Sequence, residues 1–228
     1  MVYWLTLLSD GGDFFNLFRY ITFRAGGAFL TSLLFGFVFG KPLINLLRRR
    51  QGRGQPIRSD GPEGHQSKAG TPTMGGALIL GALVVSTLLW ARLDNMHIWV
   101  VLFVTIGFGA IGFADDYAKV SKQTSAGVPG RVRLGLGFVI ALIAALLAAQ
   151  LHPEGLRLQV AVPVLKDALV PFGIVFFPFA MIVIVGTANA VNLTDGLDGL
   201  AVMPVMIAAA ALGVLAYAVG RVDFTQYL

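Results

Sequence analysis

Two adjacent carboxylates are the first residues of this chain with an evident chemical use. Asp115 and Asp116 follow a long apolar run and come just before Lys119. Like charges this close raise each other's pKa unless a cation neutralises them, and the helix macrodipole disfavours acids at a helix C-terminus. A hard cation such as Mg²⁺ takes carboxylate oxygens and keeps substrate phosphates as further ligands. The pair therefore predicts a metal-assisted phosphate site rather than a plain solvated loop.

A second polar segment, residues 189–198, lies between two apolar runs. Asn189 and Asn192 are three residues apart, so they share one face if the preceding helix continues through them. Asp195 and Asp198 are each followed by glycine, and Asp-Gly steps favour tight turns that expose backbone N–H groups to a ligand. A hairpin between two spans needs only one such step. The excess of amides and carboxylates therefore indicates a ligand site.

A third segment, Ser67–Gly76, has the sequence SKAGTPTMGG. Lys68 offers a mobile point charge for phosphate, Thr73 offers a hydroxyl group, and the two glycines permit close backbone approach. The order of residues that defines a Walker A loop is missing. For this segment taken by itself, a flexible loop is the alternative to a phosphate-binding one.

Long apolar runs must position these three segments. The chain has 228 residues, of which 56% are hydrophobic and 13% charged, whereas about a quarter of the residues in a soluble domain are charged. Cysteine is absent, which excludes disulfides and thiolate chemistry. A span needs about 20 apolar residues. The sequence predicts an all-α, polytopic transmembrane helical bundle with six spans at about 26–47, 74–90, 97–113, 134–151, 169–187 and 200–219.

Basic residues predict the orientation of this bundle. Eleven of the 17 lysines and arginines fall at the end of the first span or in the loops after the first and third spans. By the positive-inside rule these loops are cytoplasmic and the N-terminus lies outside, which places all three polar segments on the cytoplasmic side. The same bias explains the net charge of +5 without binding to nucleic acid.

We expect one integral membrane domain over residues 1–228. Residues 1–20 are amphipathic and predict an interfacial helix rather than another span. Residues 48–73 predict a cytoplasmic loop.

Taken together, three motifs resemble a known family. Residues 67–76 (SKAGTPTMGG), 115–119 (DDYAK) and 189–201 (NAVNLTDGLDGLA) are similar to motifs of the polyprenyl-phosphate N-acetylhexosamine-1-phosphate transferases, and most similar to the members that act in bacterial peptidoglycan synthesis. They occur in the family's order, at similar intervals and on its cytoplasmic face.

The resemblance implies an enzyme, its substrates and its location. Such enzymes transfer phospho-MurNAc-pentapeptide from UDP-MurNAc-pentapeptide to undecaprenyl phosphate, and form lipid I and UMP with Mg²⁺. They act as multi-pass proteins of the bacterial inner membrane, with the active site on the cytoplasmic face, and the family suggests a homodimer. Single displacement and a covalent enzyme intermediate both stay open.

The resemblance also implies roles for residues of this chain. The catalytic residues would be Asp115, Asp116, Asn192 and Asp195, of which Asp115 and Asp116 would also hold the metal. The residues that bind substrate would be Lys68, Thr73, Asn189, Gly196, Leu197 and Asp198.

The chain departs from the family pattern in length. The family has about ten spans, a further essential Asp associated with Mg²⁺, and a histidine-rich cytoplasmic loop, which this sequence lacks. We therefore expect a C-terminally truncated chain, inactive on its own. The segment Ser125–Arg133 (SAGVPGRVR) is also unlike the usual run after the acidic pair.

Two rival functions are open at this point. Within the class, a sister enzyme transfers GlcNAc-1-phosphate onto the same lipid, although the TPTMGG stretch favours the muramoyl-pentapeptide reaction. Outside the class, a cation-coupled transporter would carry acids near span centres and a related pattern in both halves. Here the acids sit at span ends and no such repeat is seen.

Overall fold

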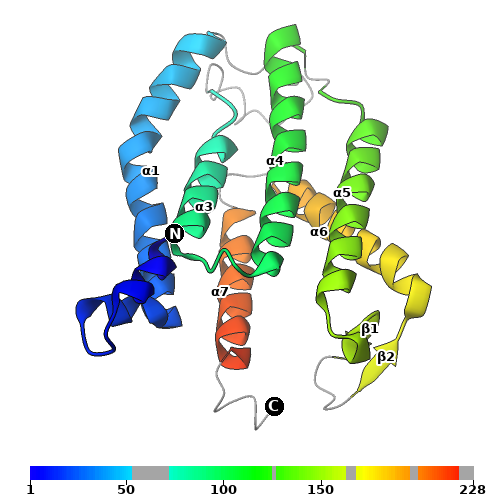
Figure 1. Ribbon diagram of the computed structural model, residues 1–228. Helices are drawn as coiled ribbons and strands as arrows, with labels where there is room; N and C mark the ends of the chain where they lie inside the picture. The colour runs from blue at the N-terminus through cyan, green and yellow to red at the C-terminus, as the bar shows by residue number, and fades with distance from the viewer. Residues whose placement is uncertain (53–71, 125–126, 163–167, 196–199, 221–228) are drawn as a thin grey trace. The chain divides into compact units, whose positions relative to one another are not determined.

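The computed structural model describes residues 1–52, 72–124, 127–162, 168–195 and 200–220 (Figure 1). It divides into two compact units, Met1–Ile140 and Ala141–Leu228. We describe each unit by itself. The prediction of one membrane domain over the whole chain stays a prediction.

The first unit is built on apolar helices. Two short 3-10 helices, η1 (Val2–Leu8) and η2 (Phe14–Arg19), precede α1 (Ile21–Gln51), α3 (Gly76–Trp90) and α4 (Met96–Lys122). Helix α5 (Gly130–Leu151) begins in this unit. Helix α3 packs against both α1 and α4 (Figure 1).

Local signals set the ends of α4. The Asn95 side chain accepts a hydrogen bond from the backbone N–H of His97, as an N-cap residue does. At the other end, Gln123 adopts the left-handed conformation with φ of 49°, which closes a helix C-terminus. The 27-residue helix therefore runs well past the apolar stretch that defines its span.

The second unit holds a small hairpin and two helices. Strands β1 (Gln159–Ala161) and β2 (Leu169–Pro171) pair antiparallel, with Val160 opposite Val170. The 3-10 helix η3 (Glu154–Leu156) precedes the hairpin, and η4 (Gly173–Val175) leads directly into α6 (Phe176–Thr194). Helix α7 covers Val202–Val219.

These helices confirm the predicted all-α membrane bundle. Five segments are long and apolar enough to cross a membrane, namely α1, α4, α5, α6 extended by η4, and α7. Helix α3 is apolar but has 15 residues, about 22 Å at 1.5 Å per residue, which is shorter than the hydrocarbon core of about 30 Å. The chain is a multi-pass helical membrane protein.

Two predicted span boundaries were wrong. The third span was ended at Phe113, but α4 continues to Lys122, so Asp115 and Asp116 are helical. The fifth was begun at Leu169, which lies in β2. The helix starts later because Pro171 and Gly173, with φ of 53°, break regular structure before Phe176.

The loop predicted over residues 48–73 also begins later than expected. Residues 48–51 belong to the last turn of α1. Within the predicted interfacial helix, residues 1–20, the structure has η1 and η2 rather than one continuous helix. Their place in the membrane interface stays a prediction.

Aromatic packing joins the start of α1 to the end of α3. Trp90 stacks on Phe18 with ring centroids 6.2 Å apart, and Phe18 meets Phe23 edge-on at 5.3 Å. The indole N–H of Trp90 donates to the Thr31 hydroxyl at 2.8 Å. Gly27 lies under the indole, and a Cβ atom there would be 2.5 Å from ring carbons of Trp90. The close approach of α1 and α3 thus depends on glycine at position 27, which has no side chain.

We predict that Gly27→Ala destabilises the protein by about 1–3 kcal/mol, because the added methyl group must displace a ring that is packed and hydrogen-bonded. At about 2–4 °C per kcal/mol for a chain of this size, thermal unfolding in detergent should shift by several degrees. The matched control is Gly26→Ala, since nothing lies within 4 Å of a Cβ atom at Gly26. Equal melting temperatures for the two variants would contradict the proposed packing.

Candidate active site

Helix α4 brings an acidic pair and a lysine onto neighbouring turns. Lys119 follows Asp115 by four residues and Asp116 by three, which is the spacing of side chains that meet on a helix surface. The Lys119 ammonium lies 2.6 Å from Asp115 Oδ2 and 3.7 Å from Asp116 Oδ1. One cation therefore serves both carboxylates.

Asp115 is the more deeply buried of the two acids, with 6% of its surface exposed. Its Oδ1 accepts a hydrogen bond from the backbone N–H of Val128 at 2.8 Å. Its Oδ2 meets both Lys119 and Arg133, whose Nη1 is 3.4 Å away. A buried carboxylate is tolerated only when it is paired and hydrogen-bonded, and Asp115 meets both conditions.

The segment after α4 fits closely around Asp115. Arg133 lies in the first turn of α5, and Gly127 and Val128, which precede this helix, reach the carboxylate. A Cβ atom at Gly127 would collide with Asp115 Oδ1 and would lie 2.9 Å from Lys119 Cε. Only glycine leaves room for this carboxylate and its lysine.

Asp116 is linked to the segment that precedes α3. The Thr73 hydroxyl donates to Asp116 Oδ2 at 3.1 Å. The backbone of Thr73 is held in turn by Gln51, which accepts from the Thr73 N–H at 2.9 Å and donates to its carbonyl at 3.1 Å. Gln51 ends α1 and is buried. The two hydrogen bonds from the Gln51 amide therefore hold Thr73 in the position from which its hydroxyl donates to Asp116.

The second unit holds another part of the predicted site. Asn189 and Asn192 both lie in α6, so the expected common face is present. The Asn189 amide donates to the Val185 carbonyl at 2.8 Å and is half-buried, whereas Asn192 and Asp195, at the helix end, are exposed. Because these residues belong to the second unit, their meeting with the acidic pair stays a prediction. The predicted residues Lys68, Gly196, Leu197 and Asp198 lie outside the described residues.

Four residues around the acidic pair were missed by sequence reasoning. The i, i+4 spacing of Lys119 from Asp115 was a usable signal once the helix was known to continue. Gln51 and Gly127 carry no such signal, because their contacts come from segments distant in sequence. Arg133 had been counted only for its charge in predicting the orientation.

The donor set suits Mg²⁺ only together with a substrate. Among the residues that the structure describes, no group of three or more Asp, Glu, His or Cys side chains could hold a metal ion. Mg²⁺ commonly binds through one or two carboxylates and completes its shell with phosphates and water. Asp116 fits this role, since 31% of its side chain is exposed. Metal binding by Asp115 would require release of Lys119 or Arg133.

Two family patterns match the chain. The model described as glycosyl transferase family 4 matches residues 98–228. The pattern described as phospho-N-acetylmuramoyl-pentapeptide-transferase signature 1 matches residues 68–80, which include Lys68 and Thr73.

Curated relatives match the whole chain. The phospho-N-acetylmuramoyl-pentapeptide-transferase of Ruegeria sp. (strain TM1040) is 72% identical over 228 residues, which are 100% of this chain and 63% of that protein. The protein of the same name from Ruegeria pomeroyi is 71% identical with the same coverage. That of Maricaulis maris is 58% identical over 97% of this chain and 62% of its own length. The chain thus spans under two thirds of the length of these relatives. The matches confirm the predicted family resemblance, and the chain belongs to glycosyl transferase family 4.

Proposed function

We propose that this chain carries the active-site core of an enzyme that transfers phospho-MurNAc-pentapeptide from UDP-MurNAc-pentapeptide to undecaprenyl phosphate. The products are lipid I and UMP, as peptidoglycan synthesis requires. The observation that carries the proposal is the cluster of Asp115, Asp116, Thr73, Lys119 and Arg133. The shared name of relatives about 70% identical supports the choice of reaction.

The reaction brings two anions together. An oxygen of the lipid phosphate attacks the phosphorus that carries the sugar, a new P–O bond forms, and the bond to the UMP phosphate breaks. Cations near the reacting oxygens lower this barrier most effectively when they are held in place beforehand. Lys119 and Arg133 are two such cations, and Asp115 holds both.

The two carboxylates have different surroundings, and we propose different tasks for them. Asp115 orients Lys119 and Arg133 towards incoming phosphates, and positions the attacking phosphate or takes its proton. Asp116, with its exposed carboxylate and its hydrogen bond from Thr73, faces the diphosphate.

Mg²⁺ is the proposed cofactor. Asp116 would hold it first, with Asp115 as a second ligand once the substrate phosphates have drawn Lys119 or Arg133 away. When bound, the ion neutralises developing charge on the phosphate oxygens. Thr73 keeps the Asp116 carboxylate oriented for this role.

Residues of the second unit complete the proposal. Asn192 and Asp195 would join the catalytic group. Asn189 would contact substrate, as would the residues outside the described ranges that share this role, namely Lys68, Gly196, Leu197 and Asp198.

The location follows from the substrates. UDP-MurNAc-pentapeptide is water-soluble and undecaprenyl phosphate is held in lipid, so the site must open at a membrane surface. Asp115 lies two turns before the end of α4, where a span reaches that surface. We propose the cytoplasmic face of the bacterial inner membrane, and a homodimer as the assembled form.

The family match favours a transferase over the rival transporter. The choice of donor is open to a direct test. The full chain is incubated in nanodiscs with radiolabelled UDP-MurNAc-pentapeptide or UDP-GlcNAc, and bound donor is counted. Turnover is measured in a chimera in which this chain replaces the matched 228 residues of the Ruegeria sp. relative, with the parent relative as control.

We expect Mg²⁺-dependent lipid I formation by the chimera and preferential binding of UDP-MurNAc-pentapeptide by the chain. Turnover of UDP-GlcNAc alone would instead assign the sister reaction. A chimera that folds and reaches the membrane but converts neither donor, while its parent is active, would overturn the proposal.

Replacing Asp116 tests the metal assignment. In Asp116→Asn the amide oxygen can still accept from Thr73, but the charge is gone. We predict a fall in kcat of about 10²–10³-fold and a higher Mg²⁺ concentration for half-maximal lipid I formation by the chimera. Asp10→Asn, at an exposed carboxylate in the N-terminal segment, is the matched control. An unchanged Mg²⁺ dependence in Asp116→Asn would contradict the role of Asp116.

Gly127 tests the position of Asp115. We predict that Gly127→Ala lowers kcat of the chimera by about 10²-fold, because displacement of a catalytic group by about 1 Å has an effect of that size. Donor binding should change much less, since the donor is held by other residues. Gly130→Ala is the control, because nothing lies within 4 Å of a Cβ atom there. Equal kcat in the two variants would show that the Asp115 carboxylate does not depend on this close fit.

A further inference from the structure

Two arginines meet at one tyrosine at the end of the first unit opposite to the acidic pair. The guanidinium carbon of Arg24 lies 5.0 Å from the Tyr3 ring centroid, and that of Arg92 lies 4.8 Å from it. Arg24 is in the first turn of α1, and Arg92 is the second residue after the end of α3. Both cations attract the electron-rich face of an aromatic ring, but a ring cannot neutralise two positive charges.

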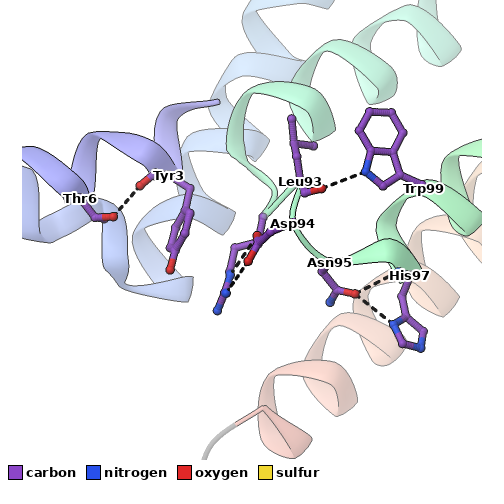
Figure 2. Close-up of polar contacts among 8 residues, drawn as sticks. Tyr3, Thr6, Leu93, Asp94, Asn95, His97 and Trp99 are labelled. Carbon is purple, nitrogen blue, oxygen red and sulfur yellow. Dashed lines mark hydrogen bonds and ion pairs between the residues drawn. The ribbon is translucent and has the colours of Figure 1, made fainter. Parts of the chain in front are cut away.

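Only one carboxylate is recorded among the partners of this pair in the described part of the chain. Asp94 accepts hydrogen bonds from Arg92, at 3.4 Å from Nε and 2.6 Å from Nη2. Asp94 lies in the short turn between α3 and α4, next to Asn95 and to Leu93, whose carbonyl accepts from the Trp99 indole, as Figure 2 shows. The Arg92 guanidinium holds the pKa of Asp94 below its usual value of 3.8, so this ion pair is fully formed at neutral pH and is lost only when the pH falls through that lowered pKa.

Arg24 is left with unused hydrogen-bonding capacity. Its Nε atom is buried and has no hydrogen-bond partner among the described residues. A buried donor without an acceptor costs about 1–3 kcal/mol, and like charge on Arg92 adds repulsion. An anion close to both guanidinium groups would remove this repulsion.

The position of this cluster restricts the anion to one that lies at a membrane surface. Spans α1 and α4 begin here, and α3 ends here. Tyr3 and Trp4 lie in η1, Trp90 is the last residue of α3, and Trp99 is in the first turn of α4. Tyrosine and tryptophan are enriched where lipid headgroups meet the hydrocarbon core. Further along α1, Phe29, Leu30 and Leu33 are exposed and offer an apolar surface for acyl chains.

We propose that Arg24 and Arg92 form a binding site for the phosphate group of an anionic membrane lipid, at the membrane face where α1 begins. Tyr3 holds the two guanidinium groups beside each other, and Asp94 fixes Arg92. Arg24 contributes its positive charge, since its Nε atom is buried. This site is separate from the proposed catalytic cluster and does not depend on its activity.

Tryptophan fluorescence can test this directly, because all three tryptophans of the chain lie at this face. The full chain is placed in vesicles of mixed phosphatidylcholine and phosphatidylglycerol, and one of the two lipids is brominated close to its glycerol group. Quenching then reports the binding constant of each lipid at this face. Since each basic residue near an anionic lipid surface contributes about 1 kcal/mol, we expect a preference for phosphatidylglycerol of about fivefold or more.

Charge variants distinguish a specific lipid-binding site at Arg24 and Arg92 from a general attraction between the basic protein and anionic lipids. The ratio of the two binding constants should fall towards one when Arg24→Gln is combined with Arg92→Gln. It should persist in Arg24→Lys and in the control Arg131→Gln, which lies in the first turn of α5. Asp94→Asn, at an exposed position, should raise the preference for phosphatidylglycerol, because it removes the negative charge beside Arg92. Circular dichroism and gel filtration confirm that each variant is folded.

Three outcomes would overturn the proposal. The first is equal quenching by both lipids in the unmodified chain. The second is an unchanged preference when Arg24 and Arg92 are both replaced in a folded variant. The third is loss of the preference in Arg131→Gln as well, because the attraction would then be general and not specific to Arg24 and Arg92.

Discussion

The neutralisation of one buried carboxylate organises the first unit of this protein. Asp115 lies in α4 just past its apolar stretch and has little exposure to solvent, so an unpaired charge there would be strongly unfavourable. Its partners come from its own helix, from the segment that follows, and from the next helix. The requirement to pair this charge therefore defines how the end of α4 and the start of α5 are joined. Gly127 also contributes to this arrangement, because a side chain at that position would occupy the space of the Asp115 carboxylate.

Asp116 extends this arrangement to the other side of α4. Its hydrogen bond from Thr73, and the paired hydrogen bonds between Thr73 and Gln51, link the end of α1 to the residues before α3 and to α4. The two neighbouring carboxylates thus have different partners: Asp115 meets Lys119 and Arg133, whereas Asp116 accepts from the Thr73 hydroxyl and has only the more distant Lys119 ammonium as a cation. This difference leaves Asp115 neutralised by the protein and Asp116 open to a cation that arrives with substrate. Phosphate transfer between two anionic substrates needs both kinds of group.

The opposite end of the unit is held by aromatic rings instead of ion pairs. Trp90 lies over Gly27 and donates to Thr31, while Phe18 covers the indole. Tyr3 gathers Arg24 and Arg92 in the same region. Cationic and aromatic side chains are common where a protein crosses from hydrocarbon to headgroups. The end near the acidic pair is therefore joined by ion pairs, and the opposite end by aromatic rings that hold two arginines.

The sequence by itself determined the membrane class, the number of apolar helices and the family, because hydropathy and contiguous motifs are local properties. It also predicted that Asp115 and Asp116 would share a site with Thr73, and the structure brings Thr73 and Asp116 into contact. The continuation of α4 through the acidic pair was missed, since helix ends depend on capping and on partners beyond the apolar run. Only the tertiary structure decided that Gln51, Gly127 and Arg133 surround this pair. Those contacts join segments far apart in the chain, and their distances depend on how helices pack rather than on any spacing in the sequence.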